Sequence, residues 1–266
     1  MKSKVKPPRK YLLTRRLDAF FQGVYNAFQF VARFFKEMFM PPFEGKEIIR
    51  QCYEIGYKSL PLITLTGFIT GFVFTKQSRP SLAEFGATSW LPSLVAIAMI
   101  RALAPLVTSL ITAGKVGSQI GAELGSMKVT EQIDAMEVSA VNPFKFLVVS
   151  RVIATTLTIP MLMMYTAFVG LMGSYLDIHL NEQTSFITFF QKAFEKITFL
   201  DFTSSIIKSV AYGFTIGIVG CYQGYKASQG TEGVGRAANT SVVISMFLIF
   251  IEEIIIVQIV NYFRFL

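Results

Sequence analysis

The stretch VIATTLTIPMLMMYTAFVGLMGSYL, residues 152–176, decides the fold of this chain. It contains no Asp, Glu, Lys or Arg, and with the residues before it forms an apolar segment over about 146–176. A helix needs about 20 mainly apolar residues to cross a bilayer. Pro160 and the glycines would weaken a helix in water, but both residue types are common in membrane helices. The segment therefore predicts a transmembrane helix.

Four further segments have the same character, and the composition of the whole chain agrees with them. We expect five transmembrane helices, over about 55–75, 90–113, 146–176, 204–225 and 237–263. Of the 266 residues, 52% are hydrophobic and only 16% are charged, whereas soluble domains carry about 25% charged residues. This composition excludes both a soluble domain and a disordered chain. The sequence predicts an all-α integral membrane protein.

The excess of positive charge lies at the N-terminus. Residues 1–50 carry eleven Lys and Arg against four Asp and Glu, and the rest of the chain is nearly balanced. On an apolar chain, this pattern favours an anionic membrane surface over nucleic acid as the partner. Residues 11–40 alternate basic and Phe-rich positions at helical spacing, which predicts an amphipathic helix in the membrane interface, ending near Pro41-Pro42. A soluble core helix is the alternative.

We therefore divide the chain into an N-terminal interfacial segment, 1–45, and a transmembrane domain, 46–266. No secretory signal peptide is expected, because charged residues interrupt the first apolar run. Basic residues favour the cytoplasmic side of a membrane, so we expect a cytoplasmic N-terminus. Five crossings then place residues 114–145 inside and residues 177–203 outside. Within the outer segment, residues 181–200 have Phe at helical spacing and predict a short amphipathic helix.

The inner segment 114–145 is the most informative part of the sequence. Gly117, Gly121 and Gly125 are four residues apart, so they share one helix face and permit close approach of another helix. A polar stretch follows, in which Thr130 is a candidate helix cap and Asn142-Pro143 a terminator. This short helix is either a docking surface for a soluble partner or a solvated connector.

Three sets of residues resemble the MlaE family, the permease subunits of Mce/Mla-type ABC transporters of lipids. The first comprises AGKVGS at 113–118, GAELGSMKVTEQIDAME at 121–137 and Asn142-Pro143. The second comprises IKSV at 207–210, CYQG at 221–224 and EGVGRA at 232–237. Gly67, Gly71 and Gln77 form the third. The resemblance covers about residues 45–260, in order and with matching spacing.

The resemblance implies a homodimeric permease in the bacterial inner membrane that moves phospholipid or a related lipid. Its implied partners are a cytoplasmic ABC ATPase and a periplasmic Mce-domain protein. The helix around residues 129–138 would be the coupling helix that seats in the ATPase. The implied coupling residues are Glu123, Met127, Lys128, Thr130, Glu131, Gln132, Asp134 and Glu137. The implied residues of the lipid pathway or dimer centre are Gly67, Gly71, Gln77, Arg101 and Glu253.

The sequence offers no catalytic machinery of its own. Gly114-Lys115 is not a nucleotide-binding P-loop, because Val116 and Ser109 stand where that motif needs Ser or Thr and its first Gly. We therefore expect ATP to be used by a partner subunit, with no cofactor bound by this chain. The two cysteines, Cys52 and Cys221, are far apart and there is one histidine, His179, so no metal site is expected.

Three charged residues fall near the middle of predicted spans: Arg101, Glu252 and Glu253. An ionisable group inside a membrane is costly and is therefore a candidate for function. The family typically has Glu after this arginine, but Ala102 stands here. We hypothesise that Arg101 pairs with Glu252 or Glu253; the alternatives are protonated glutamates or an arginine that faces lipid headgroups. The same residues would serve a second class of protein, an ion-coupled secondary transporter.

Overall fold

The computed structural model describes residues 9–41 and 43–264, and they fall into two compact units that meet between Phe43 and Glu44. The first unit consists of the single helix α1 (Arg9–Met38). Its exposed side chains include both apolar residues, such as Phe21 and Phe28, and polar ones. The amphipathic helix is thus present; its position in a membrane interface stays a prediction. Pro42, part of the predicted terminator, lies outside the described residues.

The second unit contains five helical segments that are long and apolar enough to cross a membrane. The first joins α2 (Gly45–Gly56), η1 (Tyr57–Ser59) and α3 (Leu60–Glu84). The second joins η2 (Thr88–Trp90), α4 (Leu91–Ala98), η3 (Met99–Leu103), α5 (Ala104–Thr112), η4 (Ala113–Gly117) and α6 (Ser118–Val129). The third joins η5 (Phe144–Val149) and α8 (Ser150–Glu182). The remaining two are α10 (Phe199–Tyr225) and α11 (Thr231–Arg264). The all-α membrane fold is confirmed.

The observed helices are longer than the predicted spans. The first continues through Pro80 to Glu84, and the second runs on to Val129. The prediction followed apolar composition, which ends where the chain becomes polar, whereas backbone hydrogen bonding continues the helix past that point. Three short stretches, η3, η4 and η5, are π-helical, a conformation that is rare and often accompanies functional sites.

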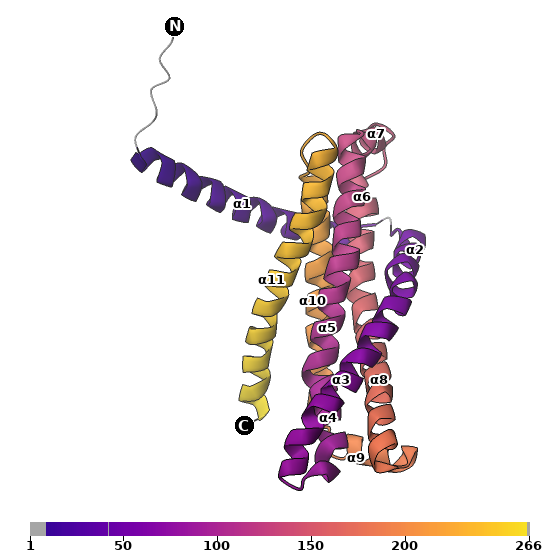
Figure 1. Cartoon of the computed structure of the whole chain (residues 1–266). Helices are drawn as coiled ribbons and strands as arrows, with labels where there is room; N and C mark the ends of the chain where they lie inside the picture. Colours follow the sequence, from indigo (N-terminus) through magenta and orange to yellow (C-terminus); the bar gives the residue numbers. More distant parts are fainter. Residues whose placement is uncertain (1–8, 42, 265–266) are drawn as a thin grey trace. The chain divides into compact units, whose positions relative to one another are not determined.

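Helix α8 lies at the centre of this unit. It packs against α2, α3 and α10, and α6 packs against α10 and α11 (Figure 1). Glycines set the closest contacts: a Cβ on Gly71 of α3 would overlap the carbonyl of Gly170 on α8, and one on Gly213 of α10 would lie 2.7 Å from the carbonyl oxygen of Thr155. The predicted close approach at the glycines of α6 is confirmed as well, since Gly121 lies against the backbone of Ala237.

Two short helices mark the ends of the bundle (Figure 1). Helix α7 (Gln132–Val138) follows α6 at one end, and α9 (Phe186–Phe194) follows α8 at the other. Helix α9 confirms the amphipathic helix predicted between residues 181 and 200, because Phe189 is fully buried while Phe186 and Phe194 are exposed. We refer to the α7 end and the α9 end below.

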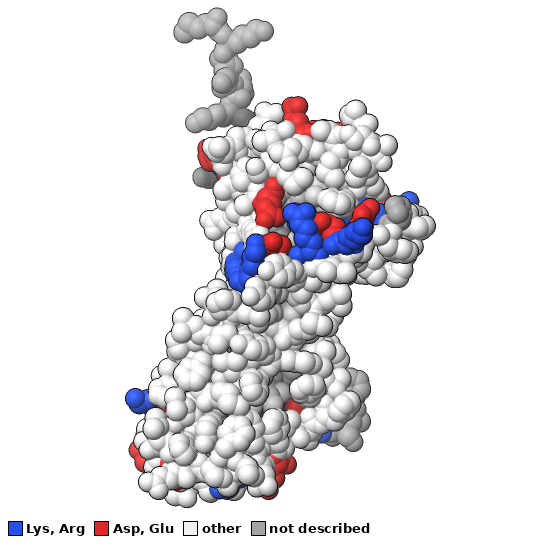
Figure 2. Space-filling model, turned by 90° about the vertical axis from the view of Figure 1, so that its right-hand side faces the viewer, with Lys and Arg blue, Asp and Glu red and all other residues white. Residues whose placement is uncertain are grey.

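Charged side chains are unevenly distributed along the bundle. On the face shown in Figure 2 they gather in a band at the height of α2, and the long surface between this band and the α9 end is almost free of them. The uncharged stretch is the part that suits the hydrocarbon core of a bilayer.

Candidate functional site

Helix α7 follows the end of α6 after a sharp reversal of the chain direction. Glu131, the residue before α7, has a φ of 58°, and it directs the chain back from Val129. The buried side chain of Ile133 anchors α7, and the Lys128 ammonium lies 2.9 Å from the Asp134 carboxylate. The predicted cap is wrong: Thr130 donates its hydroxyl hydrogen bond to the carbonyl of Ser126 instead, because this residue still belongs to the end of α6.

The polar surface of α7 is available for contact. Of the predicted coupling residues, Met127 and Lys128 are half-buried, and the others are exposed: Glu123, Thr130, Glu131, Gln132, Asp134 and Glu137. Val138, the last residue of α7, is 90% exposed. The helix ends there rather than at Asn142-Pro143, because Ala140 adopts a φ of 61°. The predicted segment is therefore a helix with an exposed acidic face.

A cluster of ion pairs lies between the spanning helices in the half of the bundle toward the α9 end. Arg101 of η3 forms two contacts with Asp201 of α10, Nε–Oδ1 and Nη2–Oδ2, both 2.7 Å long. Asp201 is fully buried; it also pairs with Arg264 near the end of α11 and accepts hydrogen bonds from the backbone and hydroxyl of Thr198. The carboxylate thus joins three parts of the chain.

A second set of contacts joins α10 to the middle of α11. The ammonium of Lys208 lies 2.7 Å from Glu253 and donates a 3.1 Å hydrogen bond to the carbonyl of Arg101. The hydroxyl of Tyr212 donates to the other carboxylate oxygen of Glu253. Glu252 accepts a hydrogen bond from Thr215. Arg101, Asp201, Lys208, Glu253 and Arg264 are called the ion cluster below.

The predicted pairing of Arg101 with Glu252 or Glu253 is wrong. Each of these groups has another partner, because Asp201 and Lys208 on α10 stand between them. The prediction did place the groups in one neighbourhood, since Arg101 and Glu253 line the same cavity of about 180 Å³, together with Lys208, Arg264 and the apolar Val257 and Val260.

Sequence reasoning missed Asp201 and Lys208 because they precede the uncharged part of the fourth span. Asp201 looked like the polar flank of a helix that begins at about 204, and Lys208 fell in the first turns of that predicted span. A signal was present at Thr198 and Asp201, since this spacing is that of a capping box and the structure has one there. It moves the start of α10 back to Phe199 and brings Asp201 inside the helix.

The other predicted pathway residues lie on α3. Gly67 packs against Thr166, and Gly71 against Gly170, so both are buried by α8 of the same chain. Gln77 is exposed on the same helix. A role of these three residues in a lipid pathway stays a prediction. Among the residues that the structure describes, no group of three or more His, Cys, Asp or Glu side chains could hold a metal ion.

The fold and the ion cluster define a class: an all-α, multi-pass membrane protein that keeps charged groups between its spanning helices. The sequence pattern of one family, Permease MlaE, matches residues 48–259. The chain therefore belongs to the MlaE permease family.

Three relatives support this assignment. A probable ABC transporter permease protein of Rickettsia typhi is 36% identical over 89% of this chain and 90% of its own length. One of a Synechocystis strain is 33% identical, with the same coverage. Protein TRIGALACTOSYLDIACYLGLYCEROL 1 of Arabidopsis thaliana chloroplasts is 32% identical over 79% of this chain and 60% of its own length.

Proposed function

We propose that this chain is the permease subunit of an ATP-driven transporter that moves phospholipid or a related lipid between the inner and outer membranes of a bacterium. The observation that carries the proposal is the ion cluster, which holds three cations and two carboxylates beside an apolar surface. Such an arrangement suits a molecule with an anionic headgroup and acyl chains. The Arabidopsis relative is named after a galactolipid, trigalactosyldiacylglycerol, which also supports a lipid as the substrate.

The proposed lipid pathway lies along α11. The side chains of Phe250, Ile254 and Ile255 are exposed, and all three lie within three positions of Glu253 in the sequence. Arg101 and Lys208 would receive the headgroup, while exposed apolar residues of α11 would contact the acyl chains. The pathway and dimer-centre assignments of Gly67, Gly71, Gln77, Arg101 and Glu253 belong to this proposal, with a second copy of the chain as the partner.

Helix α7 would connect this pathway to a separate ATPase. Its exposed acidic face suits a soluble partner, and the salt bridge between Lys128 and Asp134 ties it to α6, which packs on α10 and α11. A push on α7 would therefore reach the helices that carry the ion cluster. The α7 end and the N-terminus would be cytoplasmic, and a Mce-domain partner would meet the α9 end.

Reconstitution tests the proposal. The chain is copurified with its ATPase, placed in liposomes, and assayed for ATP-dependent transfer of a fluorescent phospholipid to acceptor vesicles. We expect the double variant Asp134→Lys/Glu137→Lys to lose at least tenfold of both ATPase copurification and transfer, because reversed charges oppose docking. Glu195→Lys, an exposed residue at the opposite end, is the control. Retained ATPase binding in the double variant would contradict the coupling role of α7.

The ion cluster also favours a second candidate, an ion-coupled secondary transporter that uses Arg101, Glu252 and Glu253. One oxygen of Glu252 is buried with no hydrogen-bond partner among the described residues, a feature of proton-carrying sites. The same liposomes separate the two functions. Transfer that runs without ATP and collapses when a protonophore dissipates the proton gradient supports the second candidate and contradicts the first.

A further inference from the structure

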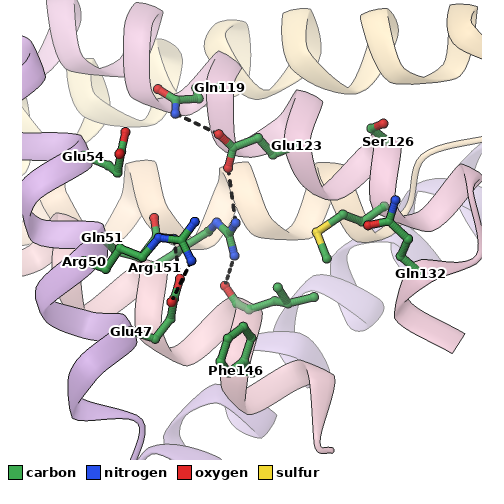
Figure 3. Close-up of a pocket in the computed structure, with 12 residues that line it drawn as sticks. Glu47, Arg50, Gln51, Glu54, Gln119, Glu123, Ser126, Gln132, Phe146 and Arg151 are labelled. Carbon is green, nitrogen blue, oxygen red and sulfur yellow. Dashed lines mark hydrogen bonds and ion pairs between the residues drawn. The ribbon is translucent and has the colours of Figure 1, made fainter. Parts of the chain in front are cut away.

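A second polar cavity, of about 540 Å³, opens near the α7 end between α2, α6 and the start of α8 (Figure 3). It is separate from the ion cluster and shares no residue with it. Its volume falls within the range of about 300–1,000 Å³ typical of small-molecule sites. Three of its lining residues, Glu123, Met127 and Gln132, also belong to the predicted coupling set, but the other nine have no role assigned above.

The cavity contains a buried guanidinium with an unfilled donor. Arg151 is only 6% exposed. It donates to the carbonyl of Leu147 at 3.1 Å and to Glu123 at 3.2 Å, but its Nε has no hydrogen-bond partner among the residues that the structure describes. A buried donor without an acceptor is unfavourable, because it has lost its hydrogen bond to water. An acceptor that enters the cavity would remove this penalty.

A second guanidinium lines the same cavity. Arg50 of α2 makes one long contact, 3.4 Å, with Glu47, and 70% of its side chain is exposed. Figure 3 shows Arg50 and Arg151 among the residues that line the cavity, each joined by a dashed line to a different carboxylate. Two guanidinium groups with free N–H donors form a favourable site for a phosphate, which they recognise in a bidentate manner.

Carboxylates line the same cavity. Glu47 is buried and accepts a 2.7 Å hydrogen bond from Gln51, whereas Glu54 and Glu123 are partly exposed. An ionised carboxylate has about four acceptor positions. Glu54 forms an ion pair with Lys58 through one of its oxygens, Oε2, so acceptor capacity remains for an ammonium group. The cavity therefore offers both signs of charge to one ligand.

The position of the cavity along the bundle indicates a lipid. The segment α2–η1, which supplies four of the lining residues, also carries three large exposed side chains that do not line the cavity: Ile49, Tyr53 and Tyr57. Tyr residues are enriched at membrane–water interfaces. From Leu60 onward the same segment is uncharged until Lys76. The cavity thus lies where the polar part of a membrane leaflet meets its apolar core.

We propose that this cavity binds the headgroup of a phospholipid that carries both a phosphate and a primary ammonium, as in phosphatidylethanolamine. Arg50 and Arg151 receive the phosphate, and Glu54 and Glu123 receive the ammonium. The acyl chains leave along the exposed side of α2. The inference rests on the proposed function for the lipid-transporting role, and it adds a headgroup site in the leaflet at the α7 end.

Binding to the detergent-solubilised full chain tests the proposal, by isothermal titration with short-chain lipids. We expect dihexanoyl phosphatidylethanolamine to bind about tenfold more tightly than dihexanoyl phosphatidylcholine, whose quaternary ammonium has no N–H donor. We expect Arg50→Gln to weaken the binding of both lipids about tenfold, because it removes a phosphate contact. Glu54→Gln removes the difference between them. Arg236→Gln, which breaks only an exposed ion pair with Glu232, leaves both affinities unchanged.

Three outcomes would overturn the proposal. Unchanged lipid binding in Arg50→Gln and Glu54→Gln shows that lipid binds elsewhere. Inorganic phosphate or phosphoethanolamine that binds as tightly as the lipid shows a site for a free anion. Loss of ATPase copurification in Glu54→Gln, with lipid affinity intact, shows a docking site for a protein. The titration uses no ATPase, so it can detect lipid binding to the cavity even if ATP-driven transfer fails. If transfer is retained but the cavity binds no lipid, the headgroup site is wrong and the proposed transport function stands.

Discussion

Helices α8 and α11 have similar apolar composition but are held in opposite ways. In the most apolar part of α8, 67% of residues are buried, whereas in that of α11 only 11% are. Glycine contacts let α3 and α10 pack directly on the backbone of α8. Beyond Ile249, α11 has no further buried residue among those described, and polar bonds join it to α10, through Glu252, Glu253 and Arg264.

This difference reflects the physics of membranes: the hydrophobic effect does not drive an apolar helix onto its neighbours, because lipid is as apolar as another helix. Close backbone packing holds the centre of this bundle. Buried polar contacts hold the outer half of α11, and such contacts weaken when a charged ligand competes for them. If a headgroup enters the ion cluster as proposed, it would compete for the contacts that attach α11.

Breaking the polar attachment of α11 is expected to have the largest effect. Glu253→Leu leaves Lys208, whose side chain is 4% exposed, without its counter-ion, and such changes destabilise by about 3–5 kcal/mol. SDS unfolding of the detergent-solubilised chain, followed by circular dichroism, measures the loss. Hydrogen exchange should rise over residues 250–264.

Glu232→Gln is the matched control on the same helix. It breaks an exposed ion pair with Arg236, and we expect a change below about 0.5 kcal/mol. Equal effects of the two substitutions would show that the ion cluster does not hold α11.

An intermediate effect is expected from the core of the bundle. Ile159 on α8 is fully buried, so Ile159→Ala removes packed methyl groups, and we expect a loss of about 2–5 kcal/mol in the same unfolding assay. Ile254 on α11 is 68% exposed. Ile254→Ala should therefore change stability by less than about 0.5 kcal/mol. If both substitutions destabilise alike, α11 is covered as fully as α8.

The smallest expected loss concerns the glycine contact of α3 with α8. In Gly71→Ala, the added methyl group overlaps the backbone of Gly170, and overpacking of this kind destabilises by about 1–3 kcal/mol. Gly235 of α11 has open space around it. Gly235→Ala should stabilise by about 0.5–1 kcal/mol, because Ala favours the helix. Opposite signs in thermal unfolding would support the comparison, and a neutral Gly71→Ala would contradict it.

Much of the fold could be predicted from the sequence. Runs of apolar residues predicted the five spans, since a bilayer requires them, and Phe spacing predicted α9. The coupling segment was predicted from resemblance, but its start was placed wrongly at Thr130. The backbone turn at Glu131 that begins α7 uses a positive φ, and a residue other than Gly or Asn gives no warning of this.

The sequence by itself determined that the chain is helical, crosses a membrane and holds charges inside it, because these properties depend on local composition and length. Only the tertiary structure decided which charges meet. Asp201 and Lys208 lie 100 and 107 positions from Arg101 along the chain, yet both contact it. Helix packing brings such groups together, and no local pattern records the distance between two helices. The same packing left α11 exposed and α8 buried, although the two segments have similar apolar sequences.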